Sequence, residues 1–353
     1  KARVAVLFGY CGSGYKGSQL NPGMPTIEAE LMKAFVAAGA ITAENNDPKK
    51  VGLNRCARTD KGVHAAGNVI SLKLRIIPNL VQAINAHLPK QIRIYDCLRV
   101  TSSFNAKNHC GGRQYEYCMP TYMLRKSCKS RYPYSNLPDP ATVQTDKKEH
   151  EESCEMGGTS WVVVDKSESY EELIKFRVAD TELEHLREVL KGYEGTHNFH
   201  NFTVGVKFNQ KNSGRYITSF AAADPFIRSD GTQWIRLFVN GQSFMLHQIR
   251  KMVSFAVMAV RTGTPATVVA ATYGEEKLNV PKAPALGLLL RKPLFEAYNR
   301  QQQKLHADRA PLEFGPYENI IEPFLDEWVQ PDMYAEEHER HIYAGWLERV
   351  DAH

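Results

Sequence analysis

Hydrophobic positions along this chain follow patterns that predict both strands and helices. Residues 3–10 form an apolar run typical of a buried strand. Residues 69–75 alternate apolar and polar positions at the period of a half-buried strand, and their polar face carries Lys73 and Arg75. Thr26 precedes a stretch, residues 27–38, whose apolar positions share one helical face, so we expect a helix that begins after this N-cap.

The same two periods recur along the rest of the chain. They predict helices at residues 79–88 and 181–191, strands at 92–100, 113–120, 215–223 and 232–240, and a long helix after Gly241 with Ser243 as N-cap. Strands and helices are mixed, which is typical of the α+β class.

Composition shifts divide the chain into four expected segments. A Pro-rich and charged stretch separates two halves of similar layout, and amphipathic residues 332–350 predict a helix packed on the body. The segments are an N-terminal half at 1–120, a variable insertion at 121–180, a C-terminal half at 181–300 and a helical extension at 301–353.

Composition and charge narrow the class of protein. The 353 residues are 43% hydrophobic and 24% charged, as in ordinary folded domains. The longest apolar stretch, residues 253–260, is far shorter than the roughly 20 residues that cross a bilayer, so we expect no membrane association. Seven cysteines without a CxxC pair favour a reducing compartment. The net charge of +5 permits a polyanionic partner.

A glycine motif after the first predicted strand resembles a dinucleotide fingerprint. Residues 12–17 match GxGxxG, but Pro22 and Pro25 delay the next helix by nine residues. A pyrophosphate needs the helix N-terminus directly at the third glycine. We therefore expect a flexible glycine loop here, and a dinucleotide-dependent oxidoreductase remains a third interpretation of the chain.

Residues 55–64 hold an unusual density of titratable side chains, arranged around the carboxylate of Asp60. Cationic neighbours favour an ionised carboxylate, which suits a nucleophile or a base, and Gly62 permits a tight turn that presents it. The alternative is an ordinary solvated Asp-Lys-Gly turn.

Two further segments offer groups that could contact a ligand. Tyr115 and Tyr117 lie two apart on a predicted strand, after Arg113, so they could stack on a nucleobase while the arginine meets a phosphate; aromatic packing is the alternative. His247 and Arg250 lie three apart at the start of the long helix. A buried arginine there would need a carboxylate partner, whereas an exposed one would face solvent.

Other catalytic signatures are weak in this sequence. His197 with His200 and His338 with His341 lack the third ligand of a zinc site, so we expect no metal. The sequence has no Walker loop and no G-x-S-x-G elbow.

Four segments resemble one known family. Residues 58–64 (Arg-Thr-Asp-Lys-Gly-Val-His) resemble the R-T-D-x-G-V-H signature of TruA-type tRNA pseudouridine synthases. Residues 113–117 are similar to the family's R-x-Y-x-Y strand, 244–250 to its helix with a basic partner, and 282–288 to its A-P-x-x-G-L segment. The motifs occur in family order and look closest to the eukaryotic multisite branch.

The resemblance implies roles for individual residues. It makes Asp60 the catalytic aspartate, Tyr115 the tyrosine stacked on the target uracil, and Arg250 the ion-pair partner of Asp60. Arg58 would help to expel the uridine. The remaining expected substrate-binding residues are Lys61, His64, Lys73, Arg75, Arg113, Tyr117, His247 and Leu288.

The resemblance also implies a fold and a reaction. We expect two similar halves about a central, largely antiparallel sheet, with helices on one side and an RNA-binding cleft. The implied reaction isomerises uridine to pseudouridine in tRNA, and in other structured RNAs, without a cofactor. A monomer is expected, located in the nucleus and also in mitochondria. The alternative is a catalytically silent RNA-binding or chaperone protein on the same scaffold.

Overall fold

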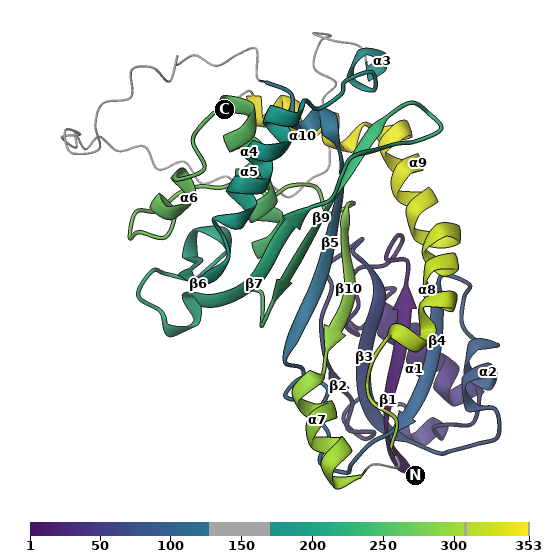
Figure 1. The fold of residues 1–353 in the computed structure, drawn as a ribbon. Coiled ribbons are helices and arrows are strands. Elements are labelled where there is room, and N and C mark those ends of the chain that lie inside the picture. The colour runs from purple at the N-terminus through teal and green to yellow at the C-terminus, as the bar shows by residue number, and fades with distance from the viewer. Residues whose placement is uncertain (127–169, 307–308, 352–353) are drawn as a thin grey trace.

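The computed structural model describes residues 1–126, 170–306 and 309–351, which form one ten-stranded sheet (Figure 1). The strand order is β4-β1-β3-β10-β5-β9-β7-β6, with β2 paired to β3 and β8 paired to β9. All neighbours are antiparallel except β3 and β10. The strands are β1 Ala2–Tyr10, β2 Asn54–Arg55, β3 His64–Leu74, β4 Ile92–Arg99, β5 Gly112–Pro120, β6 Gly195–Asn198, β7 Gly214–Ala222, β8 Phe226–Ile227, β9 Gln233–Gly241 and β10 Leu288–Leu294. The predicted α+β class is confirmed.

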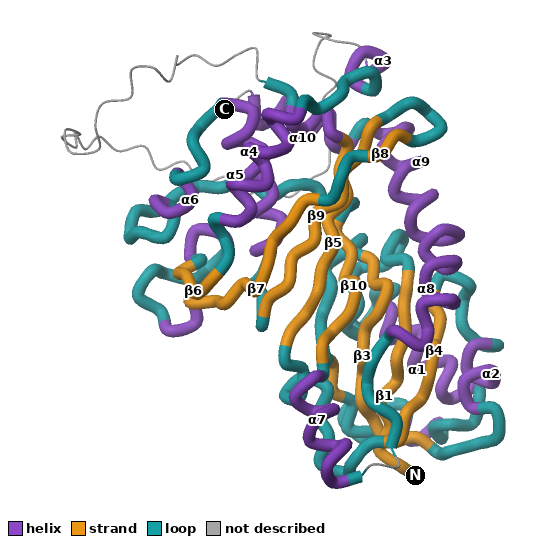
Figure 2. Tube along the Cα trace, viewed as in Figure 1, coloured by secondary structure: helices purple, strands orange, loops and turns teal. Residues whose placement is uncertain are grey.

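Helices cover both faces of the sheet, as Figure 2 shows. In β1, Val4 and Val6 pack into one hydrophobic cluster with α1 and α5, whereas Ala5 and Leu7 pack into another with α7 and α8. The expectation of helices on one side was wrong, because residues after 295 cover the second face of the N-terminal half. The helices are α1 Ile27–Ala37, α2 Leu80–Asn85, α3 Tyr170–Leu173, α4 Asp180–Lys191, α5 Gln248–Thr262, α6 Val268–Ala271, α7 Glu296–Leu305, α8 Glu318–Phe324, α9 Gln330–Arg340 and α10 Ile342–Asp351.

The predicted polar face of residues 69–75 is confirmed only at its end: Lys73 and Arg75 are exposed, whereas Val69 and Ser71 are buried. β3 is buried on both faces, and Lys73 is its one exposed residue. On the second face, the Phe314 ring lies so close to Gly67 that an added Cβ would be 2.6 Å from a ring carbon. The aromatic side chain therefore occupies the space where solvent was expected.

The two predicted halves interlock within the sheet. β5, which was assigned to the half at 1–120, pairs with β9 and β10 of the other half. β10 in turn lies between β3 and β5. Of the predicted insertion at 121–180, residues 127–169 lie outside the described part of the chain. The sheet is thus continuous across the predicted boundary at residue 120.

Two predicted helices begin or end at different residues. The long helix begins at Gln248, not after Ser243, and its N-cap His247 has a left-handed backbone with φ of 61°. The expected helix at 332–350 is split into α9 and α10 at His341, whose φ is 49°. Among the described residues, no helix is long and apolar enough to span a membrane.

Candidate active site

A cavity of about 740 Å³ lies between the loop that precedes β3, the beginning of β5 and the beginning of α5. These three segments come together because β3 and β5 flank β10 and because the chain enters α5 directly after β9. Seven of the predicted site residues line the cavity: Arg58, Asp60, Arg113, Tyr115, His247, Arg250 and Leu288.

The glycine loop at residues 12–18 supports the segment that carries Asp60. Gly12 N–H donates to Nδ1 of His64 (3.1 Å), and Ser18 exchanges hydrogen bonds with the backbone of Thr59 at 2.9 and 3.1 Å. A Cβ on Gly12 would lie 2.3 Å from the Val63 carbonyl oxygen, so this close approach requires glycine. The loop therefore packs directly against both sides of Asp60.

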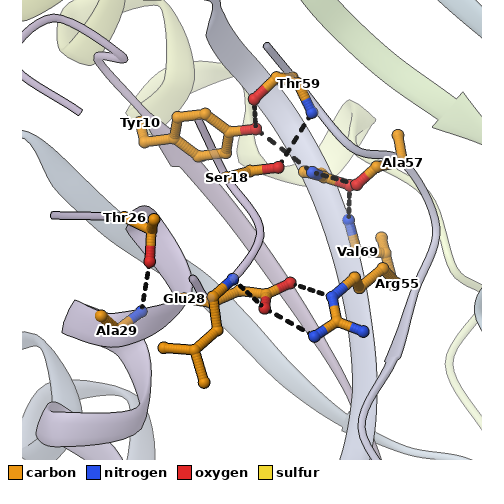
Figure 3. A network of polar contacts seen from close by, with 11 residues as sticks. Tyr10, Ser18, Thr26, Glu28, Ala29, Arg55, Ala57, Thr59 and Val69 are labelled. Carbon is orange, nitrogen blue, oxygen red and sulfur yellow. Dashed lines mark hydrogen bonds and ion pairs between the residues drawn. The ribbon is translucent and has the colours of Figure 1, made fainter. Parts of the chain in front are cut away.

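A buried polar network fixes the other side of the same segment (Figure 3). Tyr10 Oη lies 2.8 Å from Thr59 Oγ1, and Asn68 donates to the Ala57 carbonyl. Glu28, in the first turn of α1, binds the Arg55 guanidinium and also accepts from Leu20 N–H at 2.8 Å. The start of α1, β1 and β3 thus hold residues 55–59 from three directions.

We expect Glu28→Ala to lower the free energy of unfolding by about 3 kcal/mol, because it leaves Arg55 and an amide without a partner. The Glu28 side chain is only 4% exposed. Urea denaturation measures the effect. The matched control is Glu30→Ala on the same helix, whose pair with Lys33 is exposed, so it should cost less than about 1 kcal/mol. Equal losses in the two variants would contradict the structural role of Glu28.

Among the described residues, His247 is the basic side chain that lies within 4 Å of the Asp60 carboxylate. Its Nδ1 lies 3.2 Å from Asp60 Oδ2, although the two groups are not aligned as a hydrogen bond. Burial lowers the pKa of His247, as do Lys282 and Arg250, while Asp60 opposes them. The imidazole is therefore neutral at pH 7. Its left-handed backbone is an uncommon conformation that often occurs at functional sites.

Arg250 does not form the expected ion pair with Asp60 in this structure. Its Nε donates to the Ala283 carbonyl at 2.7 Å, and Ala283 N–H donates back to the Arg250 carbonyl. This reciprocal contact directs the guanidinium toward the segment before β10. Burial lowers the pKa of Arg250, and the charge of Asp60 is among the groups that raise it. The two side chains thus interact through space within the same cavity.

Tyr115 and Arg113 project from β5 into the cavity. The Tyr115 ring meets Phe244 edge to face, with centroids 5.3 Å apart, and burial raises its pKa, so the hydroxyl stays protonated. Arg113 donates to the carbonyls of Cys56 (2.8 Å) and Gln242 (3.0 Å). It therefore joins the Asp60 segment to the end of β9.

Comparison with known proteins gives the same family at two levels. A profile described as tRNA pseudouridine synthase matches residues 189–296. The tRNA pseudouridine synthase 1 of Yarrowia lipolytica is 38% identical over 99% of this chain and 74% of that protein. The chain belongs to the tRNA pseudouridine synthase family. The tRNA pseudouridine synthase 1 of Kluyveromyces lactis is 39% identical over 99% of this chain and 70% of that protein. The mouse pseudouridylate synthase 1 homolog is 36% identical over 100% of this chain and 74% of that protein.

This tRNA pseudouridine synthase is of the TruA type, as its motifs predicted, and is therefore an isomerase. The profile match contains α5 and all of β10 but not Asp60. The similarity to the Yarrowia lipolytica and Kluyveromyces lactis proteins extends over 99% of this chain.

Five expected substrate-binding residues of the synthase lie outside the cavity lining. Lys61 is exposed beside Asp60, whereas His64 and Tyr117 are buried, and Tyr117 Oη donates to the Pro284 carbonyl at 2.9 Å. Lys73 and Arg75 lie at the far end of β3, roughly 30 Å from its beginning at 3.3 Å per residue. Burial thus keeps His64 and Tyr117 out of the cavity, and distance keeps Lys73 and Arg75 away from it.

Sequence reasoning did not single out several residues that line the cavity. Phe244 and Met245 belong to the 244–250 motif, so their position in it was the available signal. Lys107 comes from the connection between β4 and β5, and no pattern in the sequence marked it.

The buried His64 should make the enzyme less stable in acid. Burial lowers its pKa to about 4, while the charge of Asp332 acts in the opposite direction; the pKa is about 6.5 in an unfolded chain. The unfolded chain therefore takes up a proton first. Stability is complete above about pH 6.5 and is lost as the pH falls toward 4, by about 3 kcal/mol in total.

The difference between wild type and His64→Asn isolates this effect. Asparagine offers an acceptor for Gly12 N–H but does not titrate, so the stability gap between the proteins should shrink by about 3 kcal/mol from pH 7 to pH 4. Urea denaturation across this range provides the measurement. Glu337, whose pKa burial raises to about 7, acts with the opposite sign but equally in both proteins. A constant gap would contradict the role given to His64.

Proposed function

We propose that the cavity around Asp60 receives a uridine of tRNA and isomerises it to pseudouridine. The C1′–N1 glycosidic bond breaks, the detached uracil rotates in place, and a C1′–C5 bond forms as C5 gives up its proton to water and N1 takes one up. Nothing is oxidised or hydrolysed. The observation that carries the proposal is the convergence of Asp60, Tyr115 and six basic residues on one cavity in a member of this family.

Each side chain has a role that fits its position. Asp60 is 42% exposed at the cavity wall, so its carboxylate can reach a ribose or base placed there, as nucleophile or as base. Tyr115 lines the cavity, and its aromatic ring is the surface on which the uracil stacks. Arg250 stabilises negative charge beside Asp60. Arg58 is exposed at the rim and helps to displace the uridine from its stem.

The target uridine enters by base flipping. A base inside a stem is unreachable until it is unstacked, at a cost of a few kcal/mol. The cavity volume of about 740 Å³ lies within the range of small-molecule sites, about 300 to 1,000 Å³. Stacking on Tyr115 and contacts of Arg58 and Arg113 with phosphates offset the unstacking cost.

Release of tritium from tRNA labelled at uridine C5 tests the reaction. C5 loses its hydrogen only when a new bond forms there. The wild-type enzyme should release label into water without any added cofactor. A catalytically silent RNA-binding or chaperone protein would bind the same tRNA in a parallel binding assay and retain the label.

We further propose that other structured RNAs are substrates, which the net charge of +5 favours. On the resemblance to the eukaryotic branch, we also propose that the enzyme works as a monomer without cofactor or metal. The same resemblance supports a location in the nucleus and in mitochondria. Sedimentation of the free enzyme tests the monomer, and tritium release after chelation tests the metal-free reaction.

A further inference from the structure

A second hollow, of about 590 Å³, lies on the other face of the sheet from the active-site cavity. Its floor comes from β5, β7, β9 and β10, and α7 borders it at the end of β10. Gln114 lines this hollow, whereas its neighbours Arg113 and Tyr115 line the active-site cavity. Successive residues of a strand point to opposite faces, so the two hollows lie back to back.

The side chains of the second hollow match a nucleotide. Tyr216 presents an aromatic ring that is 47% exposed, and such a ring is a platform for a base. Lys292 and Arg300 supply two positive charges against the single negative charge of Glu296. Within the described part of the chain, none of these four side chains makes a hydrogen bond or an ion pair with another residue.

Amide groups complete the site. The side chains of Gln114 and Gln242 line the hollow and form no hydrogen bond within residues 1–126, 170–306 and 309–351. Amides carry both donors and acceptors, as the edge of a base requires. An aromatic ring, free amides and a net positive charge together are the chemistry that binds single-stranded RNA.

The two hollows share a narrow rim at one end of the sheet. Arg113 lines the active-site cavity and donates at 3.0 Å to the carbonyl of Gln242, which lines the second hollow. Gly241 lies under this rim, where a Cβ would be 2.8 Å from the Phe244 ring. Phe244 belongs to the active-site cavity. An RNA strand that leaves the first hollow can therefore bend over Arg113 and Gln242 into the second.

We propose that the second hollow binds a single-stranded nucleotide of the same RNA that presents its uridine to Asp60. The base stacks on Tyr216, the two glutamines contact its edge, and Lys292 and Arg300 hold the adjoining phosphate. This inference rests on the proposed function for the presence of RNA in the active site. It makes the end of the sheet a binding path that continues onto the opposite face.

Three variants test the site through tRNA affinity, measured by fluorescence anisotropy with labelled tRNA. Tyr216→Ala should weaken binding by about 5- to 100-fold, the range for loss of one base stack. Tyr216→Phe should keep wild-type affinity. Arg300→Glu should weaken binding and lower the slope of log affinity against log salt by about 1. The single-turnover rate at saturating enzyme should stay within twofold of wild type in all three.

Matched controls separate this site from general charge and exposure. Lys304→Glu makes the same charge change on an exposed residue of α7 that does not line the hollow, and Phe208→Ala removes an exposed ring elsewhere. Both should bind tRNA as wild type does. Equal weakening by Arg300→Glu and Lys304→Glu, or unchanged affinity in Tyr216→Ala, would overturn the proposal.

The outcomes also distinguish this inference from the proposed function. Loss of affinity in Tyr216→Ala without tritium release by the wild type would retain the second site and refute the isomerase. Tritium release by the wild type, with unchanged affinity in Tyr216→Ala and Arg300→Glu, would support the isomerase and refute the second site. If Tyr216→Ala does not fold, as circular dichroism shows, the pair Arg300→Glu and Lys304→Glu decides alone.

Discussion

Asp60→Asn is expected to bind tRNA with wild-type affinity and to form pseudouridine at least about 10⁴-fold more slowly, the scale for loss of a group that reacts with the substrate. The amide has the shape of the carboxylate but neither its charge nor its nucleophilicity. The Asp60 side chain is partly exposed and makes no buried hydrogen bond among the described residues. The substitution should therefore leave the fold intact.

Single-turnover tritium release from C5-labelled tRNA measures the loss, with binding followed by anisotropy. Asp224→Asn is the matched control, because that side chain is 92% exposed and does not line the active-site cavity; it should keep full activity. Release by Asp60→Asn within tenfold of wild type would show that another group performs the chemistry. Loss of binding together with activity would instead assign Asp60 to RNA recognition.

The sequence predicted which side chains meet in the cavity better than it predicted their contacts. Asp60, Tyr115 and Arg250 lie on three separate segments, and the motifs placed each of them at a strand or helix end that the sheet brings together. The partner of Asp60 was predicted less well. The expected cap was Ser243, whereas α5 begins after His247. The imidazole of His247, and not the guanidinium of Arg250, lies next to the carboxylate.

Burial was the property that local patterns predicted least. The alternation in residues 69–75 predicted a solvent-exposed face on β3. The sequence did not show that Phe314 and α8, about 250 residues further along the chain, pack against this face. His64 and Tyr117 likewise look reactive in a motif but are enclosed by the glycine loop and by the segment before β10. Long-range packing, which one sequence does not reveal, decides these cases.

Arg250→Leu is expected to lower the single-turnover rate by about 10²- to 10³-fold, the scale for removal of one charged stabilising group from an active site. The guanidinium is held by Ala283 and acts on Asp60 through space. Its loss removes the permanently charged side chain that α5 contributes to the lining of the cavity. Arg250→Lys keeps the charge but not the planar contact with Ala283, so an intermediate rate is expected.

His247→Asn separates the two basic neighbours of Asp60. Asparagine tolerates the left-handed backbone at this position, so the substitution removes the imidazole and keeps the beginning of α5. Because burial and two cations hold His247 neutral at pH 7, the imidazole contributes a dipole and not a charge, and we expect a loss of about tenfold or less. Single-turnover rates at saturating enzyme compare the two variants. A larger loss in His247→Asn than in Arg250→Leu would mean that the 3.2 Å contact, and not the charge of Arg250, sets the reactivity of Asp60.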